Sequence, residues 1–163
     1  MEARNLLRKG GIAVFVGDCG VGKTRMAYEL AKLHPERSVR VCGLTRGMPA
    51  VYSTGDSLMD AIKQGFSSER DAPSGKTAIE EFTSASLLVI DELDQSITTE
   101  FAQLKLKRII DERYMAKLPT ILITNYQPNR LSRLLPKPVI SRIVECGKGF
   151  HFNWPSFRTP QTV

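Results

Sequence analysis

Stretches of largely apolar residues recur along the chain, and longer stretches with interspersed polar residues separate them. The strongest apolar stretches cover residues 11–16, 86–90 and 118–124. A short run of this kind is typical of a strand that is buried on both faces of a parallel sheet. A weaker run at 38–44 predicts another strand, and residues 150–152 predict a short strand at the edge of the sheet.

Between these runs, apolar residues recur with the spacing of an amphipathic helix. The clearest example is the stretch 23–34, whose apolar positions are Met26, Ala27, Leu30, Ala31 and Leu33. Similar patterns predict helices over 56–64, 77–82, 99–117, 131–135 and 139–144, whereas the composition of SSERDAPSG predicts a loop over 67–75. Strands that alternate with helices form parallel sheets covered on both faces. We therefore predict an α/β fold, a three-layer sandwich around a mostly parallel five-stranded sheet.

The stretch between the first strand and the first helix reads GDCGVGKT and has the spacing of a phosphate-binding loop. Such a loop surrounds a phosphate with backbone N–H groups, and the following helix adds the positive end of its dipole. Lys23 can reach the β- and γ-phosphates, and the Thr24 hydroxyl can bind Mg²⁺. A glycine-rich turn without a ligand is the alternative, which the flanking strand and helix disfavour. The predicted nucleotide-binding residues are Gly17, Asp18, Cys19, Gly20, Val21, Gly22, Lys23 and Thr24.

Polar residues also follow two other predicted strands at their carboxyl ends, where ligands bind in open α/β sheets. Asp91 and Glu92 come directly after the run 86–90. We expect Asp91 to support Mg²⁺ through water and Glu92 to orient or deprotonate the attacking water, although an acidic turn is the alternative. Asn125 follows the run 118–124, where its amide can contact the γ-phosphate or the water, or simply belong to a turn.

The segments GDCGVGKT, LLVIDELD, RIIDERY, PTILITNY and VISRI, taken in this order, resemble the AAA+ ATPases of the DnaC/IstB type. This group contains helicase loaders of bacteria and phages and the ATPase partners of certain transposases. The resemblance covers residues 11–146. It implies the P-loop NTPase core of the AAA+ (ASCE) class, with ATP and Mg²⁺ as cofactors.

The resemblance also implies a role for each matching position. Residues 17–24 look like Walker A, Asp91 and Glu92 look like Walker B, and Asn125 matches sensor 1. Arg142 is similar to the arginine finger that reaches the γ-phosphate of a neighbouring subunit, with Arg133 as a weaker candidate. A finger implies a homo-oligomer with ATP at the subunit interfaces. The catalytic set is then Lys23, Glu92, Asn125 and Arg142, and the metal set is Thr24 and Asp91.

The function implied by the resemblance is that of an ATP-hydrolysing DNA-replication factor that binds single-stranded DNA and loads a replicative helicase. Three alternatives stay open: an ATPase that assists a transposase on duplex DNA, a P-loop kinase for a small molecule, and a nucleotide-gated interaction module. The pair Asp91–Glu92, together with an Asn at a strand end, favours an ATPase over a kinase. Compared with the family, we expect a compact form without the N-terminal partner-binding region and the C-terminal helical lid.

The chain has 163 residues, which suits one domain with a sizeable core. We expect this core over residues 11–154, with an N-terminal extension at 1–10 and a tail at 155–163. No stretch is long enough to cross a bilayer, and the first residues lack the apolar centre of a signal peptide. The three cysteines lack zinc-site spacing and cannot all pair, so we expect a reducing, cytoplasmic location.

The formal net charge is +6. A basic balance is compatible with nucleic-acid binding and equally with solvated surface charge. Candidate DNA contacts on the predicted helix 99–117 are Lys105, Lys107, Arg108, Arg113 and Lys117.

Cys19 is an unusual member of the phosphate loop. Backbone N–H groups, a helix N-terminus and Lys23 all lie nearby in the predicted fold, and each favours the reactive thiolate. A thiol turned inward as a small apolar group is the alternative.

Overall fold

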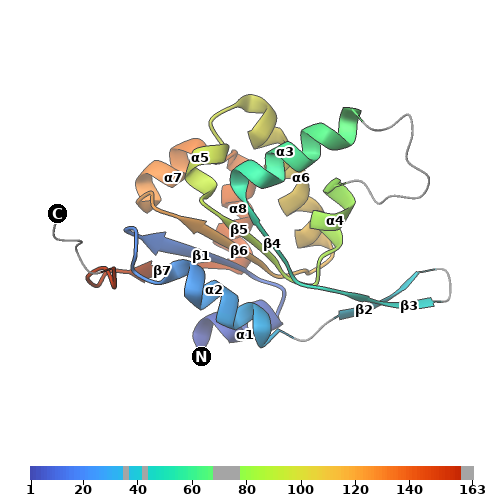
Figure 1. Cartoon of the computed structure of the whole chain (residues 1–163), viewed down its shortest axis with the longest axis horizontal. Coiled ribbons are helices and arrows are strands. Elements are labelled where there is room, and N and C mark those ends of the chain that lie inside the picture. The colour runs from blue at the N-terminus through green and yellow to red at the C-terminus, as the bar shows by residue number, and fades with distance from the viewer. Residues whose placement is uncertain (35–36, 42–43, 68–77, 159–163) are drawn as a thin grey trace.

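A parallel five-stranded sheet forms the centre of the computed structural model, which describes residues 1–34, 37–41, 44–67 and 78–158. Every pair of neighbouring strands in this sheet is parallel. The predicted α/β fold is therefore confirmed (Figure 1). The strands lie in the order β4 (Val51–Thr54), β5 (Leu88–Asp91), β6 (Thr120–Thr124), β1 (Ile12–Gly17) and β7 (Gly147–Phe152).

Helices cover both faces of the sheet, but unequally (Figure 1). One face carries α1 (Glu2–Arg8) and α2 (Lys23–Lys32). The opposite face carries α3 (Gly55–Ser67), α4 (Ala78–Ser84), α5 (Leu93–Ser96), α6 (Glu100–Met115), α7 (Pro128–Leu134) and α8 (Lys137–Cys146).

The alternation of side chains along β1 divides the interior into two cores. Val14 and Val16 belong to the larger core under α3–α8, whereas Ala13 and Phe15 belong to the smaller core under α1 and α2. Successive side chains of a strand point to opposite faces, so a central strand must be apolar throughout. This is why the unbroken apolar runs at β1 and β6 predicted buried strands correctly.

The strand predicted over 38–44 is present in part, as β2 (Arg37–Val41), but it does not join the main sheet. Those residues overlap β2 and the start of β3 (Leu44–Met48), which form a separate antiparallel pair, while 42 and 43 lie outside the described residues. One edge of the main sheet is β4, which the sequence did not predict. Its sequence VYST has only one aliphatic residue, because an edge strand needs little apolar surface.

The helices agree well with the apolar spacing, and β7 is the predicted edge strand. The predicted loop at 67–75 lies almost wholly outside the described residues. Within α2, Met26 and Leu33 are exposed rather than buried. Residues 1–10, for which no element was predicted, contain α1, and Leu7 of α1 is buried in the smaller core.

Arg113 on α6 is a structural residue, so its proposal as a DNA contact is wrong. Its side chain is 1% exposed. It donates hydrogen bonds to the carbonyl oxygens of Phe82, Ala85 and Pro119 and to Oγ1 of Thr120. Burial lowers the pKa of Arg113 to about 9, which still leaves the guanidinium charged at neutral pH. Arg113 thereby ties the residues before β5 and β6 to α6.

Candidate nucleotide-binding site

The phosphate loop runs from the end of β1 at Gly17 to the start of α2 at Lys23. Gly20 and Gly22 have φ angles of 80° and 90°, in the left-handed region that favours glycine. A Cβ on Gly20 would also collide with Oγ of Ser156. These two glycines therefore let the loop turn sharply at the carboxyl end of the sheet, where the sequence places it.

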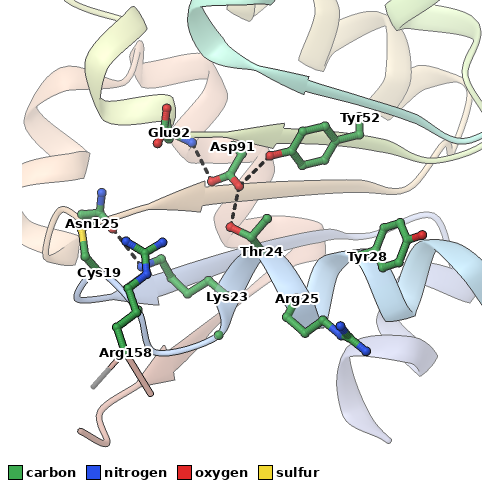
Figure 2. A pocket seen from close by; sticks show the side chains of 12 residues that line it. Cys19, Lys23, Thr24, Arg25, Tyr28, Tyr52, Asp91, Glu92, Asn125 and Arg158 are labelled. Atoms are coloured by element: carbon green, nitrogen blue, oxygen red, sulfur yellow. Dashed lines mark hydrogen bonds between the residues drawn. The ribbon is translucent and has the colours of Figure 1, made fainter. Parts of the chain in front are cut away.

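Lys23 is buried and makes three short hydrogen bonds. Its Nζ donates to the carbonyl oxygens of Gly17 and Asp18, each at 2.7 Å, and to Oδ1 of Asn125 at 2.8 Å. Burial lowers the pKa of Lys23, while Cys19 and the carboxylates of Asp91, Asp94 and Asp18 oppose that shift. The Walker A lysine and the sensor 1 asparagine of the predicted site thus contact each other directly (Figure 2).

Asp91, at the end of β5, is the centre of a second group of hydrogen bonds. Its Oδ2 accepts from Oγ1 of Thr24 at 2.6 Å and from the hydroxyl of Tyr52 at 2.9 Å. Its Oδ1 accepts from the backbone N of Glu92 at 2.8 Å. The two predicted metal-binding residues, Thr24 and Asp91, therefore lie side by side, as Figure 2 shows.

Tyr52 was not predicted from the sequence, because it lies on the unrecognised strand β4. Burial, followed by the hydrogen bond to Asp91, raises the pKa of Tyr52 to about 12. The phenol therefore remains a hydrogen-bond donor to Asp91 even at a pH at which an ordinary tyrosine loses its proton.

Glu92 lies just beyond β5 with an exposed side chain and a left-handed backbone, φ 52° and ψ 39°. A non-glycine residue in this region costs about 1–3 kcal/mol, and such strain concentrates at functional sites. The conformation turns the chain from β5 into α5. Glu92 thereby lines the same pocket as Asp91 rather than extending the strand.

Most of the predicted residues line one pocket of about 750 Å³, shown in Figure 2. The phosphate-loop residues Gly17, Asp18 and Val21 do not line it, and Val21 is buried in the smaller core. The lining also includes Arg25, Tyr28, Tyr52 and Arg158, which sequence reasoning missed. The predicted residues in the lining are Cys19, Gly20, Gly22, Lys23, Thr24, Asp91, Glu92 and Asn125.

The segment after β7 crosses over the phosphate loop. Nε1 of Trp154 donates to the carbonyl oxygen of Val21 at 3.0 Å. The backbone N of Phe157 donates to the carbonyl oxygen of Gly20, also at 3.0 Å. Arg158 reaches the pocket from this segment (Figure 2). The signal for this packing was Trp154, whose ring also lies 5.1 Å from that of Phe152, measured between centroids.

Arg142 lies on α8 and does not line the pocket of its own chain. Its guanidinium carbon is 4.4 Å from the ring centroid of Tyr114, and its Nε is 3.6 Å from Oδ1 of Asp111. The side chain is 31% exposed. The structure therefore brings Lys23, Thr24, Asp91, Glu92 and Asn125 together and leaves Arg142 apart.

A model of the ATPase family associated with various cellular activities (AAA) matches residues 13–147. The chain belongs to this family. It is 28% identical over 159 residues to the replicative helicase loader DnaC of Escherichia coli (strain K12), covering 94% of this chain and 59% of DnaC. It therefore spans about three fifths of the length of this relative.

Two solved structures share the fold of this AAA chain. The crystal structure of the DnaC helicase loader superimposes with a TM-score of 0.71 and 21% identity, covering 92% of this chain and 85% of that one. The replication initiator DnaA, bound to AMPPCP and single-stranded DNA, superimposes with a TM-score of 0.69 and 20% identity. The match covers 94% of this chain and 45% of the DnaA chain. Within the described residues, no helix combines the length and the apolar character needed to cross a membrane.

Proposed function

We propose that this AAA chain binds and hydrolyses ATP as a DnaC-like helicase loader that acts on single-stranded DNA. The observation that carries the proposal is the meeting of Lys23, Thr24, Asp91, Glu92 and Asn125 around one pocket. Similarity to DnaC along almost the whole chain supports the assignment to replication rather than to another ATP-dependent process.

The chemistry of the donor atoms fits Mg²⁺. The hydroxyl of Thr24 and the carboxylate of Asp91 are hard oxygen ligands held 2.6 Å apart at the mouth of the phosphate loop. Mg²⁺ retains part of its water shell, so Thr24 would bind it directly and Asp91 through water. When bound, the ion neutralises charge that develops on the β- and γ-phosphates.

The remaining residues have separate roles in the proposed reaction. Glu92 accepts a proton from the water that attacks the γ-phosphorus, while the bond from this phosphorus to the bridging oxygen of ADP breaks. Lys23 and Arg158 place positive charge near the phosphates. Asn125 holds the γ-phosphate or the attacking water through its amide. Phosphoryl transfer depends mostly on such positioning and charge compensation.

The proposal includes assembly. Arg142, which is similar to an arginine finger, acts on the ATP of a neighbouring subunit, and its place outside the pocket of its own chain is compatible with this role. A guanidinium supplied from a neighbour can stabilise charge spread over the γ-phosphate oxygens. Turnover then requires a homo-oligomer with ATP at the subunit interfaces.

The proposed partners are single-stranded DNA and a replicative helicase. The net charge of +6 favours contact with the phosphate backbone. The burial of Arg113 removes it from the possible DNA contacts on α6.

A steady-state ATPase assay tests the function, with Mg²⁺ present and with no DNA, single-stranded DNA or duplex DNA. We expect turnover that rises with single-stranded DNA and disappears with EDTA. Stimulation by duplex DNA alone would favour a transposition ATPase. Glu92→Gln should retain ATP binding and lose at least about tenfold in turnover, whereas Lys23→Ala should weaken binding itself. Undiminished turnover of Glu92→Gln would overturn the assignment of Glu92.

A further inference from the structure

Asp94 is a buried carboxylate to which the proposed mechanism gives no role. It lies in the first turn of α5, two residues beyond Glu92, and is 5% exposed. Burying a carboxylate is costly unless it accepts hydrogen bonds, so its presence here needs an explanation. A direct attraction to the phosphates does not explain it, because a negative charge close to the pocket repels phosphate.

The contact that explains Asp94 leads to Asn125. Oδ1 of Asp94 accepts a hydrogen bond from the backbone N of Asn125 at 3.2 Å. The next backbone N, that of Tyr126, donates to Oγ1 of Thr124 at 3.0 Å. Two successive N–H groups beyond the end of β6 are therefore fixed by side chains. This fixes the main chain from which the Asn125 side chain projects toward Lys23.

We propose that Asp94 is a positioning residue that anchors Asn125 for recognition of the γ-phosphate. The inference rests on the proposed ATPase function and adds to it a residue that holds Asn125 in position. Glu92 and Asp94 belong to one turn at the start of α5, so the same turn that carries the proposed base also holds Asn125 in place. An ionised acceptor strengthens this link, because hydrogen bonds to a charged group are stronger than those between neutral groups.

The proposal predicts a specific separation of effects. Losing the Asp94 carboxylate should reduce the contact of Asn125 with a γ-phosphate and slow hydrolysis. It should not weaken binding of ADP, which has no γ-phosphate and is repelled by the carboxylate. A purely structural role would instead lower thermal stability and reduce binding of all nucleotides together with turnover.

The experiment compares Asp94→Ala, Asp94→Asn, Asn125→Ala and the double variant Asp94→Ala/Asn125→Ala. It measures turnover of ATP and the affinities for ADP and for AMPPCP, which retains the γ-phosphate but is not hydrolysed. Asp56→Ala is the matched control, since Asp56 is an exposed aspartate in the first turn of α3. Thermal melting establishes that each variant is folded.

We expect Asp94→Ala to lose about tenfold in turnover and in the preference for AMPPCP over ADP, with ADP affinity not reduced. Asp94→Asn should recover most of this loss, because its amide oxygen still accepts from the backbone N of Asn125. In the Asn125→Ala background, Asp94→Ala should add nothing, since residues that act through one another are non-additive.

Two outcomes would overturn the inference: an unchanged preference in Asp94→Ala, or a full additional tenfold loss in the double variant. If Asp94→Ala fails to fold, Asp94→Asn replaces it in the test. A tenfold loss of turnover in Asp94→Asn, with the preference for AMPPCP over ADP unchanged, would then also overturn the inference. Absence of ATP turnover in the wild type, with the AMPPCP preference still dependent on Asp94, would refute hydrolysis while supporting the positioning role.

Discussion

Nζ of Lys23 lies 2.8 Å from Oδ1 of Asn125, and its other hydrogen bonds go to the carbonyl oxygens of Gly17 and Asp18. An ammonium group has three donors, so acceptors of the protein itself occupy all of them. A phosphate can bind Lys23 only by displacing at least one of these acceptors. The Asn125 side chain can leave by rotation, whereas the two backbone oxygens require the loop to rearrange.

Asn125→Ala should therefore move ADP binding and turnover in opposite directions. Asn125→Ala removes an acceptor that competes with phosphate, so ADP should bind about threefold to tenfold tighter, as expected for one hydrogen bond. Turnover should fall because the γ-phosphate contact is lost. Asn125→Asp should weaken ADP binding, since a carboxylate pairs with Lys23 and repels phosphate. Calorimetry measures the ADP affinity of both variants. Weaker ADP binding by Asn125→Ala would contradict the idea that phosphate displaces Asn125 from Lys23.

Arg113 offers a test of stability rather than of activity. Arg113→Met should destabilise the fold by about 3–5 kcal/mol, because it leaves several buried carbonyl oxygens without donors. Arg108→Met is the control: Arg108 pairs with Glu112 on the exposed side of α6, and such pairs contribute less than about 1 kcal/mol. Urea denaturation gives both values. Equal losses in the two variants would show that the buried hydrogen bonds of Arg113 are not needed.

Arg113 also illustrates what the sequence could and could not predict. Its neighbours Lys107 and Arg108 pair with acids on the same helix, whereas Arg113 continues the helical spacing of the buried residues Leu106, Ile109 and Ile110. Its partners come from the residues preceding β5 and β6, so its burial depends on tertiary contacts. Apolar periodicity therefore places Arg113 on the core face of α6, but the carbonyl groups that accept its hydrogen bonds are known only from the folded chain.

The candidate site was predictable where a single segment contains the chemistry. The phosphate loop and the pair Asp91–Glu92 each follow an unmistakable buried strand, and parallel strands bring their carboxyl ends to one edge. Tyr52 and Arg158 could not be placed in the same way. Tyr52 lies on a short, polar edge strand, and Arg158 reaches the pocket only because the segment after β7 folds back over the phosphate loop.

The position of Arg142 leads to a prediction about assembly. If Arg142 acts on a neighbouring subunit, turnover per subunit should rise with protein concentration. Subunits with Arg142→Ala, mixed with subunits carrying Lys23→Ala, should regain part of the lost activity. At one kind of hybrid interface, an intact pocket then faces an intact arginine. Arg133 on α7 is the weaker candidate for the finger, so Arg133→Ala is tested in the same mixture: we expect it to behave as the wild type, and rescue with Arg133→Ala instead would assign the finger to Arg133.

A rate per subunit that is independent of concentration, together with no rescue in the mixture, would indicate a monomeric enzyme. The contacts of Arg142 within its own chain allow a second test, because Tyr114 and Asp111 hold its guanidinium group. Asp111→Asn removes the ion pair and leaves the stacking on Tyr114. We expect it to lower the protein concentration at which turnover rises, as the arginine is freer to reach the neighbouring subunit.

Cys19 is exposed and lines the pocket, so the alternative in which its thiol turns inward does not hold. Cys146 is half-buried, its Sγ donates to the carbonyl oxygen of Arg142, and burial raises the pKa of its thiol. Because the thiolate is the nucleophile, a maleimide should label Cys19 faster than Cys146 in the nucleotide-free protein. Cys42 lies outside the described residues, and the same experiment measures its rate.

Bound nucleotide should slow the labelling of Cys19, since it covers the pocket and brings negative charge near the thiol. Labelled protein should in turn fail to bind ATP, because the adduct fills the space beside Lys23. A timed series analysed by mass spectrometry, with and without Mg-ATP, follows each cysteine separately, and Cys19→Ser identifies its peptide. Lys23→Ala supplies the control for protection: this variant binds ATP poorly, so Mg-ATP should leave its Cys19 rate unchanged. Equal slowing of Cys19 and Cys146 by Mg-ATP would point to a change of the whole fold rather than to cover at the pocket.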